Sequence, residues 1–81
     1  MSKYVPKEEE TKMDPWQSLA NAIVISAAKD YRAALRRLRR RPESRTAKSE
    51  IEELERFFRS DWYATLTNVP GELLIRKLKE E

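Results

Sequence analysis

The strongest constraint on the fold of this 81-residue chain is a long stretch compatible with one uninterrupted helix. Residues 16–41, between Pro15 and Pro42, contain neither glycine nor proline, the two residues that most disfavour a helix interior. A single glycine in the whole chain argues against a turn-rich all-β fold. The sequence therefore predicts an all-α protein with a long helix over about residues 15–41.

The ends of this helix carry recognisable signals. Asp14 suits the N-cap, Pro15 suits the first helical position, and Gln17 completes a capping-box spacing. Pro42 is the first residue that disfavours continuation. At about 1.5 Å per residue, the helix would be roughly 40 Å long.

Three shorter segments follow. A helix over about 47–59 is expected to start near Thr46 or Ser49, since "SEIE" repeats the capping-box pattern. Ser60 or Asp61 would cap a helical turn at 61–66.

The last predicted helix spans 71–80, and Asn68 and Val69 compete for its cap. Residues 1–13 mix charge with one proline and predict a flexible tail, which leaves 14–81 as a single helical domain.

Composition excludes several classes of function. Without cysteine or histidine, the chain can form neither disulfides nor the usual zinc sites, and it carries no nucleophile signature or glycine-rich phosphate loop. We therefore expect no enzyme, metal or cofactor. The most apolar run, at 19–28, is half the length of a membrane span, so we expect a soluble protein without a membrane segment.

Two apolar stripes on the long helix predict a homo-oligomer. One stripe includes Ala20, Ile23, Ala27 and Ala34, and the alanines recur every seven residues, which would let a second copy approach closely. A core from so short a chain is marginal, and self-association would add to it. The alternative is that both stripes are intramolecular core.

Positive charge is concentrated at one end of this helix. Residues 29–48 hold nine basic and two acidic side chains, a net +7, while the whole chain has a net charge of +3. Arg32, Arg36, Arg39 and Arg40 share one side of the helix. Aromatic rings occur near other arginines, which gives further candidates for a ligand site: Tyr31, Arg59, Trp62 and Tyr63.

Three interpretations of the arginines remain open. In the first, they complement the helix dipole and solubilise the surface, although two or three residues would suffice for that. In the second, they contact nucleic-acid phosphates, although the sequence has no helix-turn-helix, zinc-finger or basic-zipper pattern. In the third, they hold a small anionic nucleotide through bidentate guanidinium groups, with a base stacked on an aromatic ring. For Trp62 and Phe58 taken alone, ordinary core packing is the alternative.

The segments "KDYRAALRRLRRRP", "ELERFFRSDWYATLT" and "GELLIRKL" resemble a group of short uncharacterised helical proteins encoded in prophages and integrative elements of Gram-positive bacteria. The resemblance covers roughly residues 20–80, and Pro70 departs from it, because the group tends to have an acidic residue there.

This resemblance implies a phage counter-defence protein in the cytoplasm of a bacterial host. It favours a homo-oligomer that sequesters a nucleotide immune signal. A nucleic-acid-binding accessory protein and a protein inhibitor of a host defence complex are the alternatives.

Overall fold

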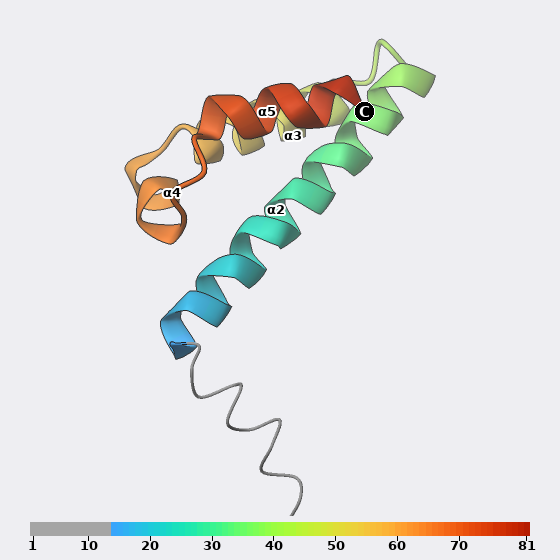
Figure 1. The fold of residues 1–81 in the computed structure, drawn as a ribbon. Coiled ribbons are helices and arrows are strands. Elements are labelled where there is room, and N and C mark those ends of the chain that lie inside the picture. The colour runs from blue at the N-terminus through green and yellow to red at the C-terminus, as the bar shows by residue number, and fades with distance from the viewer. Residues whose placement is uncertain (1–13) are drawn as a thin grey trace, which may run out of the picture.

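The computed structural model describes residues 14–81, which form four helices (Figure 1). Their bounds are α2 Pro15–Arg40, α3 Arg45–Phe58, α4 Asp61–Leu66 and α5 Gly71–Glu80. Helix accounts for 82% of this part of the chain, which contains no strand, so the predicted all-α class is confirmed. The tail predicted at 1–13 lies outside the described residues.

The helix ends explain both the accurate and the inaccurate boundaries. Asp14 accepts a hydrogen bond from the Trp16 amide at 3.2 Å, and Ser60 accepts one from the Tyr63 amide at 3.1 Å, as predicted. The predicted start of α3 near residue 47 is wrong by two residues, because Ser44 is its N-cap and accepts from the Ala47 amide.

The predicted ends of α2 and α3 and the predicted cap of α5 also differ from the structure. The structure ends α2 at Arg40 and α3 at Phe58, each one residue earlier than predicted. Neither Asn68 nor Val69 caps α5; Pro70 occupies the N-cap position and makes no side-chain hydrogen bond there.

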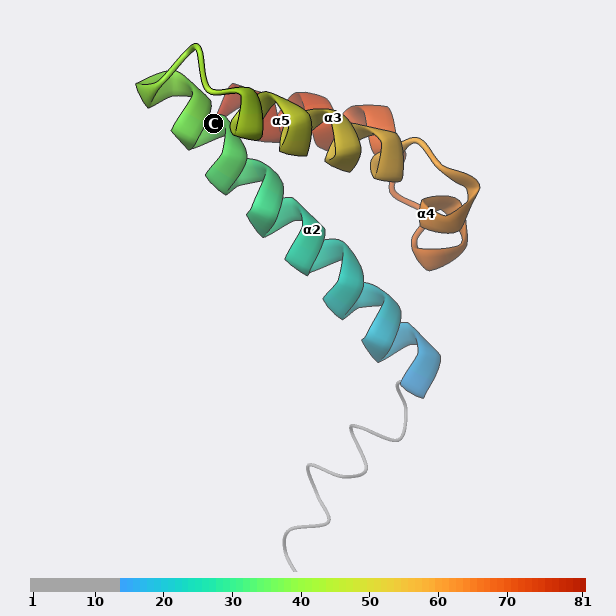
Figure 2. The same cartoon turned by 180° about the vertical axis from the view of Figure 1, so that it is seen from behind.

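The helices form a wedge that opens away from the turn at 41–44. In both views α3 and α5 lie side by side and diverge from α2, while α4 lies towards the N-terminal end of α2 (Figures 1 and 2). The turn is closed by a hydrogen bond from the Ser44 amide to the Arg41 carbonyl at 2.9 Å. At the open side, the rings of Trp16 and Trp62 contact edge to face with centroids 6.2 Å apart.

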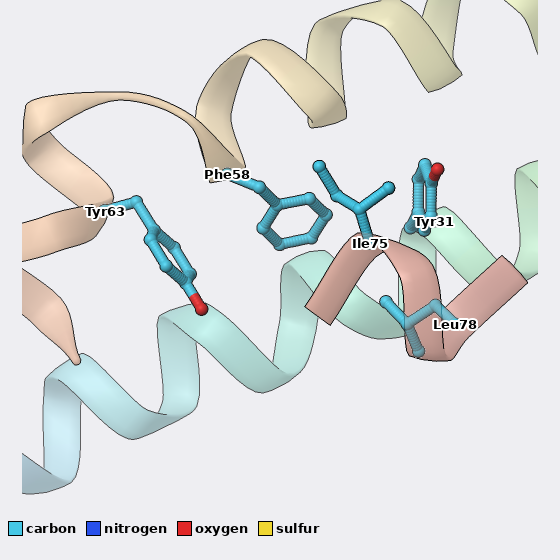
Figure 3. Packing of buried hydrophobic residues seen from close by; sticks show 5 residues of the cluster. All are labelled: Tyr31, Phe58, Tyr63, Ile75 and Leu78. Carbon is cyan, nitrogen blue, oxygen red and sulfur yellow. The ribbon is translucent and has the colours of Figure 1, made fainter. Parts of the chain in front are cut away.

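A small aromatic core fills the wedge. Tyr31 of α2, Phe58 of α3 and Tyr63 of α4 are buried together with Ile75 and Leu78 of α5 (Figure 3). Phe58 lies at the centre, with ring centroids 5.6 Å from Tyr31 and 5.7 Å from Tyr63. Each helix therefore contributes to one shared core, and Phe58 has the core role that was the alternative to a ligand site.

The close approach of α5 to the end of α3 depends on Gly71. A Cβ atom at this position would lie 1.9 Å from the Phe58 carbonyl oxygen and 2.8 Å from its carbon. Both atoms belong to the backbone, so a longer side chain could not be accommodated by a rotamer change. The one glycine of the chain thus stands where two backbones meet.

The seven-residue alanine series faces the chain's own core in part. Ala20 and Ala34 are fully covered within a single chain, and Ala27 is partly buried against the aromatic core. Small side chains are needed here because the neighbouring helices approach α2 closely. Of the four predicted interface residues, Ala20 and Ala34 are therefore unavailable to a second copy, while Ile23 and Ala27 retain partial exposure.

Candidate functional site

The turn between α2 and α3 carries a dense group of exposed cations, which we name the basic corner. It comprises the last arginines of α2, the C-cap residue that follows that helix, and two residues in the first turn of α3: Arg36, Arg39, Arg40, Arg41, Arg45 and Lys48. All six are exposed, and none has an ion-pair partner within 4 Å in the part of the chain that the structure describes. Their charges are therefore available to an external anion.

Other arginines are engaged within the chain. Arg37 pairs with Glu50 of α3, and Arg59 pairs with Glu72 of α5 and with Glu55. Such exposed pairs contribute little stability, but they reduce the positive charge that these side chains present to solvent. The basic corner thus differs from Arg37 and Arg59, whose charges are paired with carboxylates of the same chain.

Arg32 lies beside the basic corner and is occupied by Glu81. Its Nε and Nη2 atoms donate to the two carboxylate oxygens at 2.6 and 3.1 Å, a bidentate geometry. The hydrogen bond from Arg32 holds the pKa of Glu81 below its ordinary value, and the charges of Arg36 and Arg39 act in the same direction. The Glu81 carboxylate thus binds Arg32, beside the basic corner, in the way that an external anion would.

A hollow between α2 and α3 is lined by Arg37, next to Arg36 of the basic corner, but the other charges around it do not suit an anion. Asp30, Glu50 and Glu53 line it together with Arg37, so three carboxylates meet one guanidinium group. A phosphate group placed there would be repelled more than attracted.

None of the aromatic residues predicted for a ligand site presents an accessible ring to the basic corner. Tyr31 and Tyr63 are 0% and 2% exposed, so neither ring can stack on a nucleotide base without opening the core. Trp62 is 52% exposed but contacts Trp16, and twenty residues of helix, roughly 30 Å, separate Trp16 from Arg36. Arg59 stands at the far end of α3.

The structure therefore groups Arg36, Arg39 and Arg40 and places Arg32 beside them. Arg59 lies at the other end of α3, Trp62 lies beside Trp16, and both tyrosine rings are buried. A ligand held jointly by both sets stays a prediction that this geometry does not favour.

Two further parts of the site escaped the sequence analysis. Arg41, Arg45 and Lys48 complete the basic corner, and the charge excess over 29–48 was the signal that could have included them. Glu81 lies 49 positions from Arg32, and no local sequence pattern predicts that contact.

Glu55 connects three elements behind the site. Its Oε2 atom accepts from the Tyr31 hydroxyl at 2.6 Å and lies 3.4 Å from Lys79 Nζ, while Oε1 lies 3.5 Å from Arg59. Burial raises the pKa of Glu55, but the hydrogen bond from Tyr31 and the charges of Lys79 and Arg59 outweigh it, so the pKa lies below the ordinary value. The pKa of Tyr31 is raised by burial and by this carboxylate.

Removing the hydroxyl of each buried tyrosine in turn should change the free energy of unfolding by different amounts. Tyr31→Phe breaks the bond to a carboxylate, and we expect it to lower the free energy of unfolding by about 1.5–3 kcal/mol at pH 7. The Tyr63 hydroxyl is buried, has no hydrogen-bond partner within residues 14–81, and points towards α2 (Figure 3). Tyr63→Phe is therefore expected to leave stability unchanged or raise it by about 1 kcal/mol.

Urea denaturation followed by circular dichroism measures both effects. Because the folded pKa of Glu55 is depressed, the stability contributed by its ionised form is present above its unfolded pKa and is lost as pH falls through the folded value. The cost of Tyr31→Phe should accordingly shrink below about pH 4. Equal effects of the two substitutions at pH 7 would contradict this description of the core.

Comparisons with known proteins add no assignment. The chain matches no protein-family model, no curated protein and no solved structure. Within residues 14–81, no helix is both long and apolar enough to cross a lipid bilayer.

Proposed function

We propose that the protein binds the phosphate backbone of duplex DNA, without sequence preference, through the basic corner. The observation that carries this proposal is the concentration of six exposed cations over residues 36–48 that have no ion-pair partner within residues 14–81. Arg32, Arg37 and Arg59, in contrast, each pair with a carboxylate. Arginine and lysine side chains that neutralise phosphates supply the main term of nonspecific DNA affinity. A projecting corner reaches a row of phosphates on a duplex without needing a pocket.

The arrangement supports an extended polyanion better than a compact one. A small nucleotide requires cations that converge on one phosphate and a ring on which the base can stack. Here the hollow between α2 and α3 is lined by three carboxylates and one guanidinium group, and both candidate tyrosines are buried in the core. Sequestration of a nucleotide signal, which the sequence resemblance implies, stays a separate prediction.

Fluorescence anisotropy with a labelled duplex of about 20 base pairs tests the proposal. If all six cations contact phosphates, log K should fall against log salt concentration with a slope of about −5, equally for duplexes of unrelated sequence. A panel of nucleotides and cyclic nucleotides at millimolar concentration should not displace the duplex at constant ionic strength. Absence of duplex binding at 50 mM salt, or its displacement by a micromolar nucleotide, would refute the proposal.

Glu81 should compete with the duplex for Arg32. Glu81→Gln removes the carboxylate and frees one arginine, and we expect duplex affinity to rise about fivefold at 0.1 M salt. Glu80→Gln is the matched control: it removes the same charge one position away, from an exposed side chain with no ion pair in the described part of the chain. An equal gain in both variants would show a general charge effect and not competition at Arg32.

A further inference from the structure

The N-terminal half of α2 is uncharged and largely uncovered by the other helices of residues 14–81. Residues 15–28 contain no acidic or basic side chain, although 38% of the chain is charged. In both views this half of the helix lies away from α3 and α5 (Figures 1 and 2). Trp16 and Leu19 are 43% and 55% exposed. Large apolar side chains left in water on one face mark an interaction surface.

One side of this half-helix combines a ridge with a groove. Trp16 and Leu19 form the ridge, and the exposed ring of Trp62 extends it. Beside the ridge, small and apolar side chains of α2 line a shallow groove with two residues of α3: Ala22, Ile23, Ser26, Ala27, Leu54 and Phe57, with Asp30 at its end. A surface that offers both shapes can be complementary to itself.

We infer that this face binds the same face of a second copy in a two-fold contact. In a two-fold contact each patch meets its own copy, so any charge near the axis would meet a charge of the same sign. Residues 15–28 avoid that repulsion entirely. A charged partner would find nothing complementary on this face. In the proposed dimer, Leu19 of one copy inserts into the groove of the other.

The size of the face predicts a weak dimer. Fourteen helical residues span about 21 Å, and with the flanking α3 and α4 side chains the face is roughly two helix widths across. Each copy would then bury on the order of 400–500 Å², which lies below the roughly 800 Å² per partner of a standard interface. The dimer should therefore dissociate in the micromolar range.

Sedimentation velocity of the full chain from 5 to 300 µM tests this inference. The wild type should shift from monomer towards dimer, and Leu19→Glu should remain monomeric throughout. Ile25→Glu is the matched control, because Ile25 is 54% exposed but lies about 120° around the helix from Leu19, outside the groove. It should dimerise as the wild type does.

Helical content by circular dichroism verifies that the variants fold, and Ala22→Glu, at another exposed position of the groove, provides a second disruptive substitution. A wild type that stays monomeric at 300 µM would overturn the inference. So would equal dissociation by Leu19→Glu and Ile25→Glu. Since neither position belongs to the basic corner, failure here leaves the DNA proposal untouched.

Discussion

Replacing Gly71 with alanine is expected to lower the free energy of unfolding by about 2–3 kcal/mol, the cost of overpacking a well-packed contact. The new Cβ would meet the Phe58 carbonyl at a distance that no carbon atom tolerates, so α5 must move away from α3. That movement would loosen Ile75 and Leu78, which cover the aromatic core from α5.

The sign of this effect makes it informative. At an unconstrained helical position, glycine to alanine stabilises a protein by roughly 0.5–1 kcal/mol. Urea denaturation therefore distinguishes the two cases without a precise magnitude. A Gly71→Ala protein as stable as the wild type, or more stable, would contradict the close approach of α5 to the end of α3.

The triple substitution of Arg36, Arg39 and Arg40 by glutamine is expected to weaken duplex binding about a hundredfold at 0.1 M salt. Each lost phosphate contact should also reduce the salt slope by about one unit, so the slope should become shallower by about three. Because the three side chains are exposed and make no ion pair within residues 14–81, stability should change little.

A second triple variant serves as the matched control. Arg56, Arg76 and Lys77 are also exposed and free of ion pairs within residues 14–81, and they lie on α3 and α5 outside the basic corner. Their replacement by glutamine removes the same net charge. Anisotropy titrations should show a much smaller loss for this control, and similar losses in both variants would mean that overall charge, not the corner, determines binding.

Local signals in the sequence were sufficient for most of the fold. Asp14 with Pro15, the break at Pro42 and the Ser60 cap each act within a few residues, so they predicted α2 and α4 closely. Ser44 and Ser49 both precede helix-compatible residues, and the choice between them depends on burial of Ala47, which is fully covered. That contact belongs to the tertiary structure and cannot be read from spacing.

The candidate site shows the same division. The excess of arginines is visible in composition, but which of them are paired depends on contacts with distant carboxylates such as Glu50 and Glu81. Tyr63 and its neighbour Trp62 were expected in the ligand site because of their aromatic rings. The cap at Ser60 and packing against Phe58 instead turn Tyr63 into the core and leave Trp62 exposed.

The most direct test of the proposed function is amide chemical-shift mapping of the ¹⁵N-labelled protein during titration with an unlabelled duplex. We predict that the largest perturbations fall on residues 36–48, with Arg32 and Glu81 also affected as the duplex displaces their pair. No perturbation at a saturating duplex concentration, or perturbations confined to α4 and the N-terminal half of α2, would contradict DNA binding through the basic corner.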